Sequence, residues 1–246
     1  MSFSPFHPPT GEVVVWHGRI EEAWTDDARV ERALTWLDAA ERGRYARYRQ
    51  EADRQMFLLG RVMARRLVGR ALDVEPRSWR WQEGERGRPE VGEPAARVSF
   101  NLAHSAGLVV CAISHERDVG VDVEHRHRPP TDPQMVRRFC SPSEADDIER
   151  HGADGWRDRF LQYWTLKEAY LKARGVGIAV PLAEVSFTID DSGVRVSFLR
   201  SLAGLETTWA FLLEEAGSHF VAAAAAAHDG VVPRFSTAAF TTDLLP

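Results

Sequence analysis

The sequence of 246 residues has very little lysine, only two cysteines and no long apolar run. Cys111 and Cys140 provide neither a disulfide framework nor a metal-ligand spacing, so we expect two structural thiols. The longest aliphatic run, 220–227, is much shorter than the roughly 20 residues of a membrane-spanning helix. The first ten residues lack the basic and apolar regions of a secretory signal. These absences predict a cytoplasmic protein with no membrane partner.

The charge of the chain is acidic overall but basic in one segment. A net charge of -5 argues against a nucleic-acid partner, because nucleic-acid-binding domains are usually basic. Between residues 42 and 70, however, nine arginines stand against only Glu51 and Asp53. This segment is either an anion-binding surface or a solvated helix face with ion pairs between successive turns.

Lysine is so rare that its positions are informative. Of the 31 Lys and Arg residues only Lys167 and Lys172 are lysine, and both lie in the segment WTLKEAYLKA. Arginine serves every other cationic position, so these two indicate places that need a compact ammonium rather than a planar guanidinium. Chance clustering of two rare residues is the alternative interpretation.

Hydrophobic periodicity predicts two blocks, in each of which helices are followed by closely spaced strands. The first block has a strand at 13–16, helices at 26–37 and 52–72, and strands at 98–102 and 108–113, and a closely spaced strand at 119–124 follows it. The second has helices at 143–150 and 155–173, and strands at 185–189, 194–198, 207–213 and 220–226. Short connections favour antiparallel pairing. We predict an α+β fold of two similar halves, 1–118 and 119–246.

The segment GVDVE places Asp122 and Glu124 two residues apart within a β-branched run. On a strand both side chains point to the same side, while Val121 and Val123 point to the other. Two carboxylates this close repel each other. A solvated edge strand tolerates such a pair, and so does a hard cation such as Mg²⁺ bound between them.

The segment WTLKEAYLKARGVG predicts a helix in which Glu168 and Lys172 share one face, with Gly175 as its C-terminal stop. An ordinary surface pair of Glu168 and Lys172 is the alternative, worth about 0.2–0.5 kcal/mol. In the segment FNLAHSAG a strand ends in a small-residue turn that carries His104 and Ser105. This turn is either a phosphate-binding loop or a simple capped turn.

Taken together, these motifs resemble those of the 4′-phosphopantetheinyl transferases, specifically the larger monomeric type that serves surfactin, siderophore and other peptide or polyketide synthetases. The resemblance extends from about Arg44 to Phe187. In order along the chain, its motifs are D-x-x-x-F-L-L-G at 53–60, G-R-P at 87–89, FNLAHS at 100–105, GVDVE at 120–124 and W-x-x-K-E-A-x-x-K at 164–172. The family's fold is two similar α+β halves related pseudo-symmetrically, with coenzyme A bound between them.

The resemblance implies that four residues act at the diphosphate of coenzyme A. Asp122, Glu124 and Glu168 match the carboxylates that hold Mg²⁺ against the coenzyme A diphosphate. Glu168 also matches the proposed general base, and Lys172 matches a lysine that contacts the diphosphate. We therefore expect Asp122, Glu168 and Lys172 to be the catalytic residues.

For the rest of coenzyme A, the resemblance implies binding residues in the first half. Arg44 stands where a basic residue meets the 3′-phosphate, and Gly87, Arg88 and Pro89 match a loop along the adenine nucleotide. His104 matches a histidine that contacts a coenzyme A phosphate, and Ala103 and Ser105 flank it in the same motif. Two positions depart from the family pattern, since Ala103 replaces a common serine and Arg88 a common lysine.

The sequence thus predicts a Mg²⁺-dependent monomeric enzyme that transfers 4′-phosphopantetheine from coenzyme A to a serine of an apo acyl or peptidyl carrier protein. Adenosine 3′,5′-bisphosphate is the other product. Two alternatives use the same residues. One is a catalytically silent module that binds a carrier protein or a nucleotide, and the other is a metal-dependent phosphodiester hydrolase.

Overall fold

The computed structural model describes residues 11–84, 89–93, 98–115, 117–128, 132, 134–175, 180–203, 209–227 and 230–246. Contacts divide the chain into two compact units, Met1–Arg117 with Arg234–Pro246, and Asp118–Pro233. Each unit combines helices with a largely antiparallel sheet, so the predicted α+β fold is confirmed. In the part of the chain described, no helix is both long and apolar enough to cross a bilayer.

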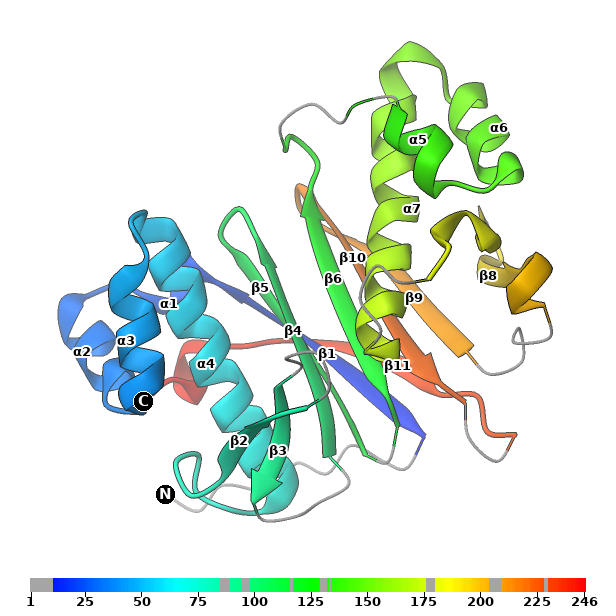
Figure 1. Cartoon of the computed structure of the whole chain (residues 1–246). Helices are drawn as coiled ribbons and strands as arrows, with labels where there is room; N and C mark the ends of the chain where they lie inside the picture. The colour runs from blue at the N-terminus through cyan, green and yellow to red at the C-terminus, as the bar shows by residue number, and fades with distance from the viewer. Residues whose placement is uncertain are drawn as a thin grey trace. The chain divides into compact units, whose positions relative to one another are not determined.

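The first unit is a four-stranded sheet covered by helices (Figure 1). The strand order is β11-β1-β5-β4, and β2 and β3 form a separate hairpin. Its strands are β1 (Glu12–Arg19), β2 (Arg80–Glu83), β3 (Pro89–Glu93), β4 (Val98–Ser105), β5 (Leu108–His115) and β11 (Arg234–Ala239). Its helices are α1 (Ile20–Ala23), α2 (Asp27–Leu34), α3 (Ala39–Arg47) and α4 (Glu51–Leu72), with the short 3-10 turn Thr242–Leu244 near the C-terminus.

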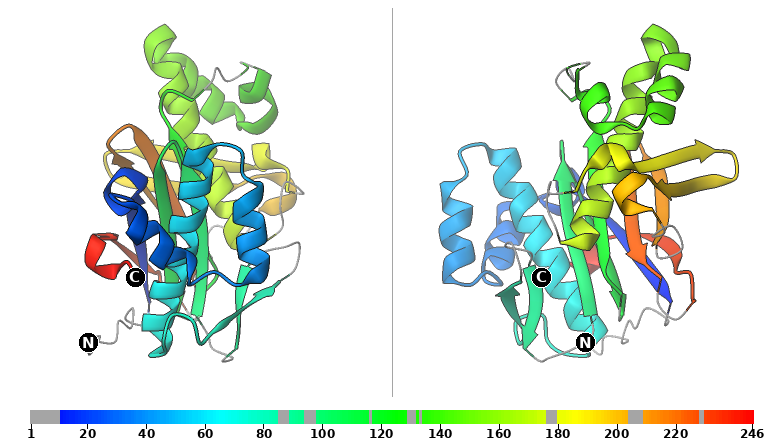
Figure 2. Two further views of the ribbon diagram at one scale, coloured as in Figure 1. Left: turned by 90° about the vertical axis from the view of Figure 1, so that its left-hand side faces the viewer. Right: turned by 45° about the vertical axis from the view of Figure 1, so that its right-hand side comes forward.

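Helix α4 is the longest element of the first unit and packs on β4 and β5 (Figures 1 and 2). Leu59, Val62, Met63 and Leu67 recur at three- and four-residue spacing and are fully buried. The helix ends at Leu72, and the left-handed backbone of the next residue, Asp73, prevents the helix from continuing. The periodicity that predicted this helix therefore also forms the core of the unit.

The predicted assignment of the last thirteen residues, 234–246, to the second half is wrong. The prediction placed everything after residue 118 in the second half, but β11 pairs in parallel with β1 in the register Glu12 to Arg234 and His17 to Ala239. The C-terminal segment therefore belongs to the first unit. This pairing joins segments more than 200 residues apart in the sequence, which a local pattern does not reveal.

The second unit contains a three-stranded antiparallel sheet in the order β6-β10-β9 and a β7–β8 hairpin. Its strands are β6 (Val119–His125), β7 (Val185–Asp190), β8 (Gly193–Phe198), β9 (Trp209–Ala216) and β10 (His219–Ala226). Its helices are α5 (Gln134–Phe139), α6 (Pro142–Arg150) and α7 (Gly152–Arg174), with 3-10 turns at Leu182–Glu184 and Arg200–Leu202. Helix α7 packs on β6 and β10, as α4 packs on its own sheet (Figure 1).

A buried ion pair connects α7 to α6 and to β7. The ammonium of Lys167 on α7 lies 2.9 Å from the carboxylate of Glu144 on α6, and both side chains are almost completely buried. Lys167 also donates to the carbonyls of Leu182 and Val185, while Glu144 accepts from the amide of Phe187. Every charge is thus paired and hydrogen-bonded, which is the condition under which a buried ion pair is tolerated.

Gly120 lets α7 approach β6 more closely than any other residue would permit. A Cβ atom at this position would lie 2.1 Å from the carbonyl oxygen of Ala169 and 2.3 Å from the amide nitrogen of Ala173. Both atoms belong to the backbone of α7, so no side-chain rotation relieves the clash. The close approach of the helix to this strand therefore depends on a glycine on the strand and on alanines on the helix.

Replacing Gly120 by alanine should force α7 away from β6 and lower the free energy of unfolding by about 1–3 kcal/mol, the usual cost of overpacking. Urea denaturation followed by far-UV circular dichroism measures this change. Gly43→Ala is the matched control, because a Cβ at Gly43 on helix α3 meets nothing within 4 Å. Equal urea midpoints for Gly120→Ala and the wild type would show that the close approach is not needed.

Candidate functional site

Asp122 and Glu124 lie on the face of β6 that is turned toward α7. Because side chains alternate along a strand, they share this face with Gly120. Asp122 accepts a hydrogen bond from the ammonium of Lys172 at 2.6 Å. Glu124 accepts one from the indole nitrogen of Trp164 at 3.0 Å. Both donors belong to α7, so the strand and the helix assemble one polar cluster.

Helix geometry places Glu168 in the same cluster. Trp164, Glu168 and Lys172 are four residues apart on α7, and residues at this spacing lie one above the other on a helix. Glu168 therefore stands one turn from the partner of Glu124 and one turn from the partner of Asp122. Arg128, just beyond the end of β6, forms an ion pair with Glu124. Two carboxylates, each with a cationic partner, thus lie at one end of the β6–α7 contact, and Glu168 is on the same face of the helix.

Each of the three carboxylates has a raised pKa. Burial raises the pKa of Asp122 despite the nearby ammonium of Lys172. Burial and then the charge of Asp122 raise the pKa of Glu124 to about 7, and the same two causes raise the pKa of Glu168. Since the folded protein holds these protons more tightly than the unfolded chain, ionising Glu124 reduces stability as the pH rises from its usual 4.5 to about 7.

The cluster has the chemistry of a hard-cation site. The second carboxylate oxygen of Asp122, Oδ2, is buried and accepts no hydrogen bond. Carboxylate oxygens are the ligands that Mg²⁺ takes, and a cation would relieve the mutual repulsion of the three acids. Throughout the described ranges, no three His, Cys, Asp or Glu side chains converge as a ready metal-binding group. Here Lys172 and Arg128 hold oxygens of Asp122 and Glu124, and a cation has to displace them.

The two lysines have different surroundings. Lys167 is fully enclosed and bonded to Glu144, so it is a structural residue of α7. Lys172 is half-buried and reaches the acidic cluster. That both positions need a compact ammonium rather than a guanidinium stays a prediction. Only Lys172 can also contact a ligand.

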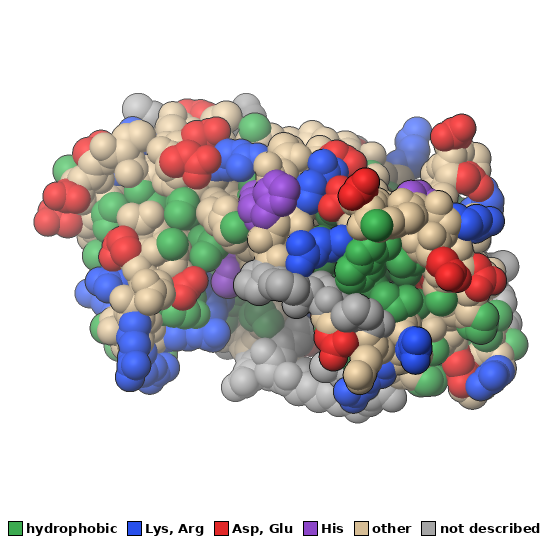
Figure 3. Space-filling model, turned by 90° about the horizontal axis from the view of Figure 1, so that it is seen from above, with side chains coloured by type: hydrophobic (Ala, Val, Ile, Leu, Met, Phe, Trp, Pro, Cys, Tyr) green, Lys and Arg blue, Asp and Glu red, His purple; other side chains and the backbone are tan. Residues whose placement is uncertain are grey.

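The first unit contains part of the predicted nucleotide-binding set. Arg44 on α3 and Pro89 at the start of β3 line the same cavity of about 390 Å³. Gly87 and Arg88, which complete the predicted G-R-P loop, lie outside the described residues. Figure 3 shows basic side chains gathered on the surface of this unit, on the left of the view.

The remaining predicted residues, Ala103, His104 and Ser105, lie at the C-terminal end of β4. Ala103 is buried in β4, His104 is exposed and Ser105 ends the strand. The turn that follows, Ala106-Gly107, has positive φ at both residues, as in a tight two-residue hairpin. None of the three lines the cavity beside Arg44. The structure therefore confirms the predicted turn, and His104 is not among the residues that line this cavity.

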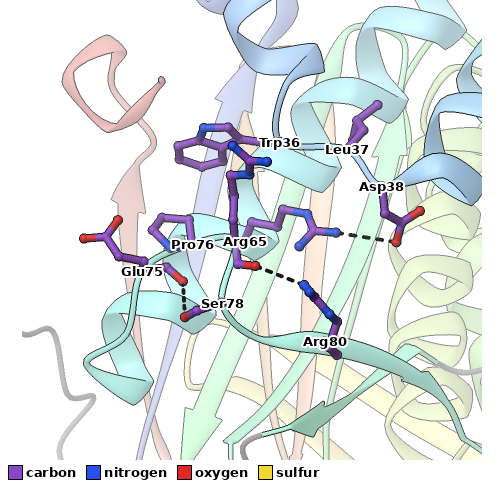
Figure 4. Close-up of a pocket in the computed structure, with 9 residues that line it drawn as sticks. Trp36, Leu37, Asp38, Arg65, Glu75, Pro76, Ser78 and Arg80 are labelled. Atoms are coloured by element: carbon purple, nitrogen blue, oxygen red, sulfur yellow. Dashed lines mark hydrogen bonds and ion pairs between the residues drawn. The ribbon is translucent and has the colours of Figure 1, made fainter.

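Among the neighbours in these sites, Arg128 and Trp81 belong to no predicted motif, whereas Trp164 lies in the 164–172 motif and Arg61 in the arginine-rich segment without an assigned role. Trp164 and Arg128 contact Glu124, and Arg61 and Trp81 line the cavity beside Arg44. A larger cavity of about 680 Å³ lies next to it and shares Asp38 (Figure 4). Only the folded arrangement reveals these neighbours, because each contact joins different elements.

Comparison with known proteins covers both units. Residues 118–225 match the profile of the 4′-phosphopantetheinyl transferase superfamily, and residues 22–116 match that of the 4′-phosphopantetheinyl transferase N-terminal region. The 4′-phosphopantetheinyl transferase HetI of Nostoc sp. is 31% identical over 229 residues, which cover 91% of each chain. The chain belongs to the 4′-phosphopantetheinyl transferase superfamily. The predicted family is thereby confirmed.

Other members of the superfamily match shorter parts of the chain. A phosphopantetheinyl transferase of Thraustochytrium sp. is 36% identical over 202 residues, covering 76% of this chain and 70% of its own. The 4′-phosphopantetheinyl transferase Sfp of Bacillus subtilis is 28% identical over 164 residues, covering 66% and 72%. Among solved structures, holo-[acyl-carrier-protein] synthase of Thermotoga maritima aligns with 44% of this chain and 62% of its own, with 22% identity and a TM-score of 0.38.

In this phosphopantetheinyl transferase superfamily member, Asp122→Asn should lower the pKa of Glu124. The substitution removes the negative charge that opposes ionisation of Glu124 while leaving its burial in place. Carbon-13 NMR titration of the side-chain carboxyl groups in metal-free protein measures the change. Asp190→Asn, at the exposed end of β7, is the control and should leave the pKa of Glu124 unaltered. An unchanged value in Asp122→Asn would mean that the two carboxylates do not interact.

Proposed function

We propose that this protein transfers the 4′-phosphopantetheine group of coenzyme A to a serine of an apo acyl or peptidyl carrier protein. The single observation that carries the proposal is the joining of Asp122, Glu124, Glu168 and Lys172 by β6 and α7. These four residues lie within the segment that matches the superfamily. Coenzyme A supplies the transferred group, and adenosine 3′,5′-bisphosphate leaves.

Mg²⁺ is the metal that fits the acidic cluster best. Asp122, Glu124 and Glu168 would hold it through carboxylate oxygens, and the unpartnered Oδ2 of Asp122 is a ligand atom already buried at the site. When bound, the ion would neutralise the diphosphate and so lower the cost of bringing an anionic substrate to three carboxylates.

The side chains of the cluster can supply the remaining chemistry. In phosphoryl transfer, catalysis consists of positioning the reactants and stabilising the charge that develops. Glu168 would accept the proton of the attacking serine hydroxyl, and Lys172 would stabilise negative charge on the departing bisphosphate. No covalent intermediate on the protein is needed. Freed from Asp122, the ammonium of Lys172 has its donors available for this role.

We propose coenzyme A-binding roles for residues of each unit, taken separately. The first unit would hold the nucleotide end through Arg44 and Pro89, which line one cavity, together with Gly87 and Arg88. His104, flanked by Ala103 and Ser105, would contact a phosphate from the end of β4. The second unit would hold the diphosphate through the acidic cluster and Lys172.

Mass spectrometry of an apo carrier protein incubated with coenzyme A and Mg²⁺ tests the proposed activity. The carrier should gain the mass of one phosphopantetheine group, and chelation of the metal should abolish the gain. Asp122→Asn should lower kcat by about 10²–10³-fold, as expected when a charge-stabilising group is lost. Asp190→Asn, which lies outside the cluster, should keep full activity.

The same experiment separates the alternatives. Bound but unconsumed coenzyme A would favour a silent carrier-binding or nucleotide-binding module. Cleavage of coenzyme A without modification of the carrier would favour a phosphodiester hydrolase. Failure to modify any of a fatty-acid, a polyketide and a peptide carrier protein would contradict the proposed transferase activity.

A further inference from the structure

Arg128 is paired with the acidic cluster although it belongs to no predicted motif. It lies three residues beyond the end of β6, in a turn that its amide closes by donating to the carbonyl of His125 at 3.0 Å. The turn directs its guanidinium back to Glu124, with which it forms an ion pair and a hydrogen bond. A local turn therefore places a cation on one of the three carboxylates.

Arg128 and Trp164 donate to the same oxygen of Glu124, Oε1. Packing fixes the indole of Trp164, because its ring centroid lies 5.2 Å from that of Phe139 and 6.2 Å from that of Phe160. Arg128 reaches Glu124 through a long, flexible side chain that is 27% exposed. Of the two donors, Arg128 is therefore the one that can turn into solvent while the other stays.

The charge of Arg128 acts on more than its direct partner. Burial raises the pKa of Asp122, of Glu124 and of Glu168, and the positive charge of Arg128 opposes this rise at each of them. The guanidinium is thus a counter-ion of the whole cluster.

A divalent cation and Arg128 compete for the same carboxylate. Both take oxygens of Glu124, and two positive charges repel each other at this range. An ion pair whose cation is partly exposed is weak, so Arg128 can be released at a small cost. A divalent cation carries twice the charge and can therefore replace it.

We infer that Arg128 is a placeholder counter-ion: it neutralises Glu124 in the metal-free protein, is displaced by the divalent cation, and thereby lowers the affinity for the metal. Trp164 keeps Glu124 in position during the exchange. The inference rests on the proposed function only in placing a divalent cation at the acidic cluster.

Electron paramagnetic resonance of free Mn²⁺, titrated into the full-length protein without substrate, tests the inference. Arg128→Gln should bind Mn²⁺ about 3- to 10-fold more tightly than the wild type, because the ion no longer has to displace a guanidinium. This change corresponds to roughly 0.7–1.4 kcal/mol, at or slightly above the upper end for exposed ion pairs, because Glu124 is only 16% exposed. Arg128→Lys keeps the charge and should stay close to the wild-type affinity.

Arg126→Gln is the matched control. Arg126 follows the same strand and pairs with Asp158 and Glu215 rather than with the acidic cluster. Its loss removes the same charge without releasing a carboxylate of the cluster, and salt screens the remaining long-range effect. The Mn²⁺ affinity of this variant should differ from that of the wild type by less than about twofold at roughly 0.15 M salt.

Three results would overturn the inference. Weaker Mn²⁺ binding by Arg128→Gln would mean that Arg128 supports the cation site by orienting Glu124. An unchanged affinity would mean that the ion pair does not compete with the metal. Equal tightening in Arg126→Gln would mean that only the net charge of the protein matters.

Asp122→Asn separates this inference from the proposed function. It should weaken Mn²⁺ binding, because the ion lies at the acidic cluster; binding that it leaves unchanged would contradict the inference. If Arg128→Gln tightens Mn²⁺ binding at the cluster but the wild type modifies no carrier protein, the proposed function fails and the inference stands. If the wild type modifies carrier proteins and Arg128→Gln leaves the Mn²⁺ affinity unchanged, the inference alone fails.

Discussion

The close approach of α7 to β6 at Gly120 is the constraint on which the acidic cluster depends. With no Cβ atom on the strand, and only Ala169 and Ala173 on the facing turns of the helix, the two backbones come almost into contact. This separation is what allows the short side chain of Asp122 to meet Lys172, and Glu124 to meet Trp164. The buried Lys167–Glu144 pair fixes the same helix from its other side.

The packing of α7 on β6 brings carboxylates near one another, and their negative charges repel. A cationic ligand would reduce this repulsion. Asp122, Glu124 and Glu168 are held together in partial burial, and each has a raised pKa because ionisation is unfavourable there. Lys172 and Arg128 compensate only in part. The cavity of the first unit has the opposite imbalance, with more arginines than acids. The acidic cluster therefore favours a cation and the cavity of the first unit an anion.

Sequence patterns were sufficient to predict the helices and strands that are determined by residues close together in the chain. The periodicity of α4 and the alternation of β6 were sufficient to place both elements, and the spacing within each predicted which side chains share a face. The capping box of Asp38 and Glu41 could also have predicted the start of α3. By contrast, the pairing of β11 with β1 and the stacking of Arg61 on Trp81 join distant segments. Such contacts are decided by tertiary packing, and even the motif at 53–60 next to Arg61 does not show which side chain it meets.

We propose above all that Asp122, Glu124 and Glu168 form a single divalent-cation site. Paramagnetic broadening of backbone amide signals by Mn²⁺ tests this claim directly in the wild-type protein, without any substrate. Mn²⁺ takes oxygen ligands as Mg²⁺ does. We expect broadening at low Mn²⁺ to be strongest for the amides around these three residues and to be reversed by excess Mg²⁺. Broadening centred elsewhere, or equal broadening in Asp122→Asn, would show that these three residues do not form a cation site.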